Sequence, residues 1–416
     1  MTLSRRRLLG TTGLAIASAA VAKAHGDELK PEIKPAPSLV KKSGPNILVL
    51  IQLAGGNDGL NTVAPMTDPL YKKLRPTLAL ASSEVLDLDG KLALNGAMNS
   101  LHARLKAKND VAIVTGVHYP NSNRSHFEST AIWQTARMQP HLEAEGWVGR
   151  ALETDPKLGS FGMTSVGGGA LTPALYAASA QATVLSSLDA FAAQPDKKFM
   201  GDAPALFAAL KALYVEGASD HGDADEAVVR QVGESALASS QRLKEAASGY
   251  QSMVAFPKGG FGDQCRLSSQ LLASDLGVRV LHLTLGGFDT HAYQRPQQRS
   301  LLQQLSDGIT AILDDTAAHG FEGKVTVMTY SEFGRRAAEN GSGGTDHGSA
   351  SVLFLAGAGV QGGLHGTPPD LANLQGGDVP CTTDFRAVYA SVLHDLLATK
   401  PEKQLMQGIL PIKLFA

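Results

Sequence analysis

Four apolar, strand-like runs in this chain each lead into a loop that carries aspartate or histidine. The runs are residues 48–53 (LVLIQL), 278–285 (VRVLHLTL), 325–330 (VTVMTY) and 352–356 (VLFLA). In an open parallel sheet the carboxyl ends of the strands lie at one edge, and ligands bind in the crevice there. We therefore expect one pocket that collects the ligand-type side chains of these loops: Asp58, Asp289, His291, Asp346, His347 and His365. Carboxylates and imidazoles together suit a divalent metal such as zinc or manganese.

Helix-like runs alternate with the strand-like runs, which predicts an α/β fold with a mostly parallel central sheet. Residues 111–115 form a further strand candidate, and a helix is expected over 127–136 with its start near Ser125 or His126. Other helices are expected at 299–318 and 384–399. A stretch rich in alanine and other helix formers, at about 196–253, predicts a helical insertion.

The N-terminal residues are typical of an export signal. A twin-arginine pattern (SRRRLL, residues 4–9) precedes an apolar stretch and an Ala22-Lys23-Ala24 cleavage site. The domain prediction is therefore a signal peptide at 1–24, a linker at 25–43 and an α/β domain at 44–416. An uncleaved anchor is the alternative, and the short, interrupted apolar run disfavours it. We expect a periplasmic or secreted protein with no transmembrane segment in the mature chain and the twin-arginine translocase as its partner during export.

Charge and cysteine content limit the kinds of ligand that the protein is expected to bind. The formal net charge is −2 and the pI about 6.6, which gives no support for nucleic-acid binding. Cys265 and Cys381 are the only cysteines, so a thiolate metal site cannot form and any metal must take nitrogen and oxygen ligands. A disulfide between the two and a pair of free thiols are both compatible with the sequence.

Each candidate ligand also has a plain structural interpretation. Asp58, in a glycine-rich turn, could cap the next helix. Asp289 and His291 stand two apart, so both side chains point to one face of an extended chain, but the pair could equally lie in a surface turn. Asp346 and His347 are adjacent and suit either one ligand to each of two ions or a ligand beside its supporting partner.

Ser125 is the candidate nucleophile, because a helix start favours a bound anion and a hydroxyl that moves toward alkoxide. Ser125 and Glu128 also form the Ser-x-x-Glu signature of a capping box, and Ser122 competes for the role. Glu332 could be a further ligand or an acid/base and Arg335 could bind an anionic oxygen, although a surface salt-bridge loop is the interpretation we favour for both. The expected substrate-binding residues are Asn57, Arg124, His126, Glu332 and Arg335.

The chain resembles the secreted family known as domain of unknown function 1501. The matching stretches are the twin-arginine leader, LVLIQLAGGNDGLNTVAP, NRSHFESTAIWQTA, GGFDTH, YSEFGRR with GTDHGSASVLFLAG, and DFRAVYASVL. They cover nearly the whole mature chain.

The candidate site residues occur in the order Asp58, Ser125, Asp289, His291, Asp346, His347 and His365. This order is similar to that in the alkaline phosphatase and sulfatase superfamily, which includes cofactor-independent phosphoglycerate mutase. That resemblance implies a three-layer alkaline-phosphatase-like sandwich with two metals beside the nucleophile. Asp58, Asp346 and His347 would hold one metal next to Ser125. Asp289, His291 and His365 would hold the other. The chain departs from the pattern in its Asp289-x-His291 spacing, where the superfamily has three residues between, and it lacks the sulfatase C/S-x-P-x-R motif.

The leading hypothesis is an exported metallohydrolase of phosphate or related anionic esters. It would use two divalent ions (zinc or manganese, with magnesium or calcium also compatible) and Ser125 as nucleophile. The alternative is a catalytically inactive envelope binding or assembly protein with the same fold. A redox enzyme ranks last, because no G-x-G-x-x-G pattern follows the first strand.

Overall fold

The computed structural model describes residues 46–139, 144–156, 158–187, 203–216, 249–399 and 408–416, together with 230, 233–234, 237–243 and 245. The predicted signal peptide and linker lie outside the described residues. The chain divides into two compact units. Residues 41–184 and 252–416 form the larger unit, which contains the sheet and the candidate site.

The larger unit is built on a nine-stranded sheet with the order β11-β5-β10-β9-β1-β8-β6-β7, and β12 also pairs with β5. The strands are β1 (Ile47–Ala54), β5 (Val111–His118), β6 (Met163–Val166), β7 (Thr183–Leu185), β8 (Val280–Gly286), β9 (Val325–Tyr330), β10 (Ser351–Gly357), β11 (Gly363–Gly366) and β12 (Thr383–Asp384). β1 is apolar along nearly its whole length and buried on both faces, as expected for a central parallel strand.

Strand direction decides which loops meet. β1 pairs in parallel with β8 and with β9, and β6 pairs in parallel with β8. β10 is antiparallel to both of its neighbours, β9 and β5. β5 therefore runs in the same direction as β9, and the carboxyl ends of β1, β5, β8 and β9 lie at one edge. Because β10 starts at this edge, the loop that joins β9 to β10 both leaves and returns there.

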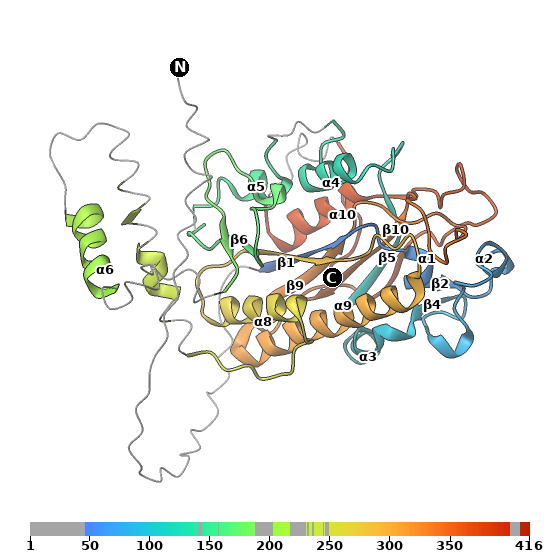
Figure 1. Ribbon diagram of the computed structural model, residues 1–416, viewed down its shortest axis with the longest axis horizontal. Coiled ribbons are helices and arrows are strands. Elements are labelled where there is room, and N and C mark those ends of the chain that lie inside the picture. Colours follow the sequence, from blue (N-terminus) through green and yellow to red (C-terminus); the bar gives the residue numbers. More distant parts are fainter. Residues whose placement is uncertain are drawn as a thin grey trace, which may run out of the picture. The chain divides into compact units, whose positions relative to one another are not determined.

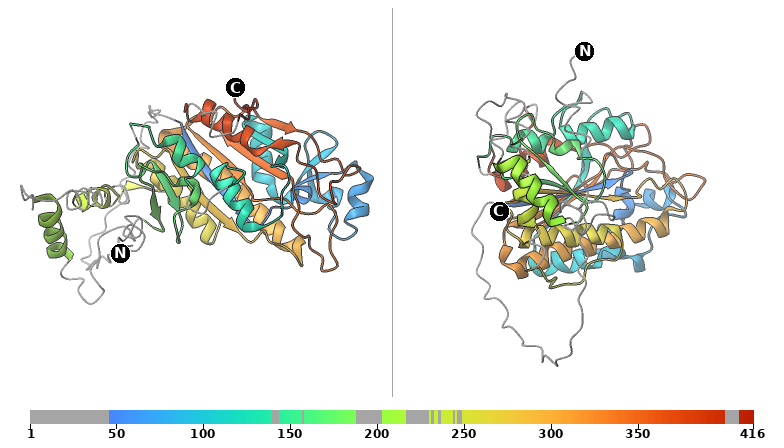
Figure 2. Two further views of the ribbon diagram at one scale, coloured as in Figure 1. Left: turned by 90° about the horizontal axis from the view of Figure 1, so that it is seen from above. Right: turned by 60° about the vertical axis from the view of Figure 1, so that its left-hand side comes forward.

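Helices cover both faces of the sheet (Figure 1). One face carries α4 (His126–Thr135), α5 (Trp147–Leu152) and α10 (Phe385–Ser391); the other carries α3 (Asn99–Lys108), α8 (Gly260–Ala273) and α9 (Gln294–Thr316). The right-hand view in Figure 2 shows the same separation, with α4 on one side and α8 and α9 on the other. The predicted three-layer α/β arrangement with a mostly parallel sheet is confirmed.

Aromatic rings fill the layer between the sheet and the first helix group. Trp147 stacks on Tyr389 with ring centroids 4.1 Å apart, and Trp133 stacks on Phe385 at 4.3 Å. All four rings are buried, and such pairs contribute about 1 kcal/mol each beyond the burial of their apolar area. They join α4, α5 and α10 into one packed layer, which holds the N-terminus of α4 at the sheet edge.

The shorter elements complete the unit. A second, three-stranded sheet has the order β2-β4-β3. The remaining elements are β2 (Val63–Pro65), β3 (Val85–Asp87), β4 (Leu92–Asn95), α1 (Gly59–Thr62), α2 (Pro69–Leu74), the 3-10 helices η2 (Ser82–Glu84), η3 (Gly96–Met98) and η4 (Pro173–Leu175), and the π-helical turns η7 (Ala317–Phe321) and η8 (Val392–Leu396). Within the described residues, no helix has the length and apolarity needed to cross a bilayer.

Most predicted elements are present with small boundary shifts. The helix expected over 127–136 is α4, one residue earlier, and the helix expected at 299–318 is α9, which starts five residues sooner. The described part of the predicted helical insertion contains α6 (Ala203–Lys211) and the π-helical turn η6 (Ala212–Glu216), which belong to the smaller unit. Much of the rest of that stretch lies outside the described residues.

Candidate metal centre

Three loops pack against one another at the carboxyl edge of the sheet. Ala54 at the end of β1 is in register with Gly286 at the end of β8, so the loops that follow start side by side. Gly55 has a φ of +119°, and a Cβ there would lie 2.3 Å from the backbone nitrogen of Asp289. Only glycine allows this approach. The glycine-rich turn therefore brings the first loop directly against the loop that carries Asp289.

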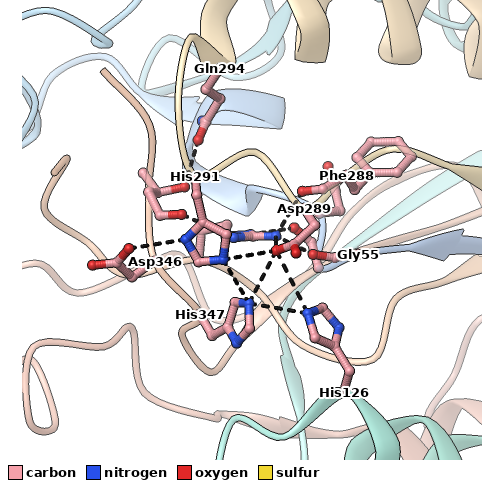
Figure 3. A network of polar contacts seen from close by, with 12 residues as sticks. Gly55, His126, Phe288, Asp289, His291, Gln294, Asp346 and His347 are labelled. Atoms are coloured by element: carbon pink, nitrogen blue, oxygen red, sulfur yellow. Dashed lines mark hydrogen bonds and ion pairs between the residues drawn. The ribbon is translucent and has the colours of Figure 1, made fainter. Parts of the chain in front are cut away.

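Four side chains from these loops and from α4 converge; we call His126, Asp289, His291 and His347 the His–Asp cluster (Figure 3). His126, Asp289 and His347 each offer a ligand atom, all within 4.8 Å of one another. His347 Nε2 lies 3.1 Å from Asp289 Oδ1 and 3.1 Å from His126 Nε2. His291 Nε2 lies 3.0 Å from Asp289 Oδ1 and 3.0 Å from His347 Nε2.

The opposite ring nitrogen of each histidine faces a hydrogen-bond acceptor. Nδ1 of His126 is 2.8 Å from Oε1 of Glu332, and Nδ1 of His291 is 3.1 Å from Oδ1 of Asp346. Nδ1 of His347 is 3.1 Å from the backbone carbonyl of Arg124. Since these partners accept, each Nδ1 carries the proton, and the Nε2 lone pairs of the neutral rings point toward Asp289. This is how proteins orient histidines that bind metal.

The facing lone pairs repel one another unless a cation lies among them. Burial lowers the pKa of His347, which favours the neutral ring at neutral pH. Burial opposes ionisation of Asp289, but Arg335, through its hydrogen bond and its positive charge, holds the pKa of this carboxyl below its usual value. Nitrogen ligands about 2.0–2.1 Å from zinc lie about 3.3 Å apart in a tetrahedron. The cluster has this chemistry and close to this spacing, so its residues fit a divalent ion.

Asp346 supports the cluster and lies outside it. Its Oδ1 accepts hydrogen bonds from His291 and, at 3.2 Å, from Asn340 Nδ2. Hydrogen bonds from Asn340 and His291 hold the pKa of Asp346 below its usual value. Asp346 and His347 were expected either to bind one ion each or to be a ligand and its own supporting partner; in the structure Asp346 supports His291, and His347 is supported by the carbonyl of Arg124.

Arg335 is a buried clamp. Its Nη2 donates to Asp289 Oδ1 at 2.7 Å, and its side chain is fully buried. Its other acceptors are the backbone carbonyls of three loops: Gly55, Gly56, Phe288 and Thr345. The favoured prediction of a surface salt-bridge loop is wrong here, because five polar contacts draw the guanidinium inside. The same contacts occupy the donors with which Arg335 was expected to bind substrate.

Glu332 is buried as well, so the surface interpretation is also wrong for this residue. Its Oε1 accepts a hydrogen bond from the backbone nitrogen of Gly55 at 2.8 Å as well as from His126. The carboxylate therefore connects the turn after β1 to the start of α4. In this position Glu332 orients His126.

Asp58 is engaged in a buried ion pair and a helix cap. Its Oδ1 accepts from the backbone nitrogens of Leu60 and Asn61 at the start of α1. Its Oδ2 lies 2.5 Å from Nη1 of Arg75 and also accepts from Gln294. Asp58 and Arg75 are both almost completely buried. Four donors thus surround this carboxylate, and the alternative prediction of a capping aspartate describes its contacts.

His365 is placed elsewhere by the direction of one strand. The prediction assumed that the strand at 352–356 ends at the same edge as the others. β10 runs the opposite way, so its end lies at the far edge of the sheet. His365 sits in β11, in register with Val114 in the middle of β5. Its Nε2 is 2.9 Å from the carbonyl of Gln361.

Ser125 is the N-cap of α4. Its Oγ accepts from the backbone nitrogen of Glu128 at 3.5 Å. Its neighbours in sequence, His126 and Arg124, both contact the cluster or its support, so Ser125 lies between two anchored residues. The competing Ser122 accepts a hydrogen bond from the backbone nitrogen of Arg124 at 3.3 Å. The capping interpretation of Ser125 matches the structure.

Asn57 is buried in the turn after β1. Its backbone nitrogen donates to Ser331 Oγ at 2.8 Å, and its Oδ1 accepts from Thr62. Its Nδ2 is buried with no hydrogen-bond partner among the described residues. Two contacts therefore give this residue a structural role.

Of the predicted ligands, Asp289, His291 and His347 lie in the cluster, whereas Asp58, Asp346 and His365 do not. The prediction also missed His126 as a cluster member and Arg75 as the partner of Asp58. His126 was expected to contact substrate, and it lies in the cluster. Its only signal was its place beside Ser125 at a helix start. Arg75 was not singled out at all, since a lone arginine in α2's C-terminal cap carries no pattern that relates it to Asp58. Cys265 and Cys381 are free thiols, of which Cys265 is buried.

Comparisons with known proteins agree with the family resemblance. Residues 214–407 match the model of a family described as "Protein of unknown function (DUF1501)". No curated protein matches the chain.

Several solved structures are similar over most of the chain. Ps i-CgsB, in complex with k-i-k-neocarrahexaose, is 10% identical with a TM-score of 0.40. The similar region covers 87% of this chain and 74% of the Ps i-CgsB chain. The PsFucS1 sulfatase from Pseudoalteromonas sp. is 13% identical with a TM-score of 0.39, and the similar region covers 90% of this chain and 72% of the sulfatase chain. The alkaline phosphatase from the Antarctic bacterium TAB5 is 9% identical with a TM-score of 0.34 and covers 77% and 95%.

Proposed function

We propose that this chain is a metal-dependent hydrolase that acts on phosphate or related anionic esters. The observation that carries the proposal is the orientation of three imidazoles. Each of His126, His291 and His347 turns its Nδ1 to an acceptor and its Nε2 toward Asp289 Oδ1. A set of lone pairs directed at one region serves no packing purpose, and a divalent cation removes the repulsion among them.

We propose one ion in this centre. His126, Asp289 and His347 form the ligand set, and three protein ligands leave an open position, as in catalytic zinc sites. The two-ion arrangement implied by the superfamily resemblance would need Asp58 and His365. Asp58 is instead saturated by Arg75 and three other donors. His365 lies on the edge strand β11, beside the middle of β5, with its Nε2 2.9 Å from the carbonyl of Gln361. Zinc and manganese both suit nitrogen and carboxylate ligands.

The start of α4 gives the site its preference for anions. The positive end of a helix dipole and its free backbone N–H groups favour a bound negative charge. α4 has ten residues and its first is His126 itself, so an anionic ester held at the cluster would lie against that end. Ser125, the residue before, is the proposed nucleophile.

His291 is the proposed acid–base group. Asp346 holds its Nδ1–H, which leaves Nε2 free to accept a proton 3.0 Å from Asp289 and from His347. An imidazole oriented by a carboxylate is the arrangement that proteins use for proton transfer. A divalent ion bound beside it would polarise an ester oxygen and make water more acidic.

We also propose that the protein is exported across the membrane. The twin-arginine pattern and the Ala22-Lys23-Ala24 site at the N-terminus support a signal peptide, translocation by the twin-arginine translocase and a periplasmic or secreted location.

Metal content after purification from the exported fraction tests the centre. Wild-type protein is expected to carry about one zinc or manganese per chain and to hydrolyse p-nitrophenyl phosphate or bis(p-nitrophenyl) phosphate. Asp289→Ala and His347→Ala are expected to lose both metal and turnover, and His365→Ala, the matched control outside the cluster, to retain both. Wild-type protein that binds none of zinc, manganese, magnesium or calcium would refute the proposal.

A binding or assembly protein without catalysis is the second candidate. It is favoured by the engagement of Ser125 Oγ as a helix cap and by the position of His291. If His291 served as a fourth ligand, a tetrahedral zinc would have no open position. Metal-loaded wild-type protein with no turnover on any anionic ester would support this candidate over the hydrolase, provided that its metal affinity falls when His291 is replaced by alanine, as expected of a fourth protein ligand.

A further inference from the structure

The imidazole of His347 is oriented by a backbone group, unlike the other two rings of the cluster. His126 and His291 have carboxylates on Nδ1, whereas His347 Nδ1 donates to the carbonyl of Arg124 at 3.1 Å. A backbone carbonyl can hold a ring only if the backbone itself is held. The orientation of His347 therefore depends on the conformation of Arg124.

Arg124 adopts a conformation that arginine avoids. Its φ is +62°, in the left-handed region, which costs a residue with a side chain roughly 1–2 kcal/mol. Such conformations persist where surrounding contacts enforce them, and they are frequent at functional sites. Two contacts restrain Arg124: its backbone nitrogen donates to Ser122 Oγ at 3.3 Å, and its side chain forms an ion pair.

The guanidinium of Arg124 is bound to Asp378. Nε and Nη2 lie 2.8 and 2.7 Å from the same oxygen, Oδ2. The side chain of Asp378 is only 6% exposed, while that of Arg124 is 37% exposed. A charge-assisted bond with two donors to a buried carboxylate restricts the arginine more than a surface pair would.

Asp378 is itself anchored to the loop that carries His347. The backbone nitrogen of Ala337 donates to the carbonyl of Gly377, and Arg336 Nη2 donates to the carbonyl of Gly376 at 2.7 Å. The backbone nitrogen of Arg336 in turn donates to the carbonyl of Asp346 at 3.0 Å. Both ends of the path from Asp378 to His347 are thus tied to the same loop.

We propose that Asp378 and Arg124 form a positioning pair: Asp378 holds Arg124 in its left-handed conformation, and the Arg124 carbonyl then directs His347 Nε2 into the His–Asp cluster. The effect of this pair on metal affinity rests on the proposed function. The orientation of His347, in contrast, is a property of the chain without any ion. Supporting partners of metal-binding histidines typically change metal affinity by about 10–100-fold when they are lost.

Two substitutions of Arg124 separate backbone from charge. Arg124→Gly and Arg124→Ala both remove the ion pair, but only glycine adopts a positive φ without strain. Arg124→Gly is expected to keep zinc affinity within about 3-fold of wild type, because glycine occupies the left-handed region without strain and the hydrogen bond from its backbone nitrogen to Ser122 Oγ remains. Arg124→Ala is expected to weaken it by about 10–100-fold. Equal affinities of the two variants would overturn the proposal.

Substitution of Asp378 tests the other member of the positioning pair. Asp378→Ala is expected to weaken zinc binding as Arg124→Ala does. The double variant Asp378→Ala with Arg124→Gly is expected to recover the affinity of Arg124→Gly alone, since glycine no longer needs the carboxylate. A double variant as weak as Asp378→Ala would show that Asp378 acts by another route.

The metal-free protein supplies an independent readout. In protein labelled with nitrogen-15 at histidine, two-bond proton–nitrogen spectra report the tautomer of each ring. His347 is expected to be protonated at Nδ1 in the wild type and in Arg124→Gly, and to show a mixture in Asp378→Ala and Arg124→Ala. If wild-type protein bound no metal, the proposed function would fail while these spectra still decided the positioning pair. Unchanged spectra in all variants would overturn it.

Discussion

The guanidinium of Arg335 donates from Nη2 to Oδ1 of Asp289 at 2.7 Å, while the same arginine binds the backbone carbonyls of the neighbouring loops. A single buried side chain therefore aims the cluster's carboxylate and joins the turn after β1 to the loops after β8 and β9. Asp289 Oδ1 thus contacts the permanent positive charge of Arg335 and also faces the imidazoles of His126, His291 and His347.

Arg335→Lys should disrupt this clamp despite preserving the charge. A lysine ammonium has three donors at a point and cannot reproduce the planar fork that reaches three loops. We expect a loss of stability of about 2–4 kcal/mol, because buried carbonyls lose their partners. Chemical denaturation followed by tryptophan fluorescence measures it. A loss below about 0.5 kcal/mol would mean that the carbonyl contacts are dispensable.

Glu332→Gln should reduce metal affinity without unfolding the protein. The amide keeps an oxygen for the backbone nitrogen of Gly55, but it is a weaker acceptor for Nδ1–H of His126 than the carboxylate. We expect zinc affinity to fall about 10-fold and the thermal midpoint to change little. Competition with a chromophoric chelator gives the affinity. The comparison variant is Glu128→Gln, which lies in the first turn of α4 and outside the cluster; its zinc affinity should match that of the wild type.

Arg75→Met should destabilise the fold while leaving the metal count unchanged. It removes the partner of a buried carboxylate, and breaking such a pair costs about 3–5 kcal/mol. The His–Asp cluster contains neither Arg75 nor Asp58, so elemental analysis of the folded variant should still find about one ion per chain. A variant that gained a second ion would show that Arg75 occupies a place where Asp58 could bind metal.

Stability should fall steeply in acid because of two buried histidines. Burial lowers the pKa of His118 and of His282 to about 3, against about 6.5 in an unfolded chain. Above pH 6.5 neither state holds the extra proton and stability is full. Between about pH 6.5 and 3 only the unfolded chain takes it up, so stability falls by about 1.4 kcal/mol per pH unit for each histidine.

His118→Leu isolates one of these contributions. Neither ring nitrogen of His118 has a hydrogen-bond partner among the described residues, so an apolar side chain of similar size loses no bond there. We expect the variant to be about 2 kcal/mol more stable than wild type at pH 5, relative to their difference at pH 7.5. Denaturation curves at the two pH values measure this. The prediction would be wrong if the difference in unfolding free energy between the two proteins were the same at pH 5 and pH 7.5.

The sequence alone determined the main elements and part of the composition of the site. Apolar runs of strand length, alternating with helical periodicity, are local properties, and β1, β8, β9, α4 and α9 follow from them with small boundary errors. Asp289, His291, Asp346 and His347 could be predicted as neighbours, because parallel strands bring their carboxyl ends to one edge. The helical spacing of residues 127–136 predicted the start of α4 near Ser125 or His126, and Ser125 is its N-cap.

Only the tertiary structure decided which of those residues face one another. The direction of β10 is a matter of pairing between distant strands, and its reversal removes His365 from the edge where the other loops meet. Arg75 and Asp58 are 17 residues apart, yet no local pattern relates them. Their pairing follows from the packing of α2 against the turn after β1. His126 became a cluster member for the same physical reason: a ligand set is defined by the positions of atoms in space, and sequence patterns report only the elements that carry them.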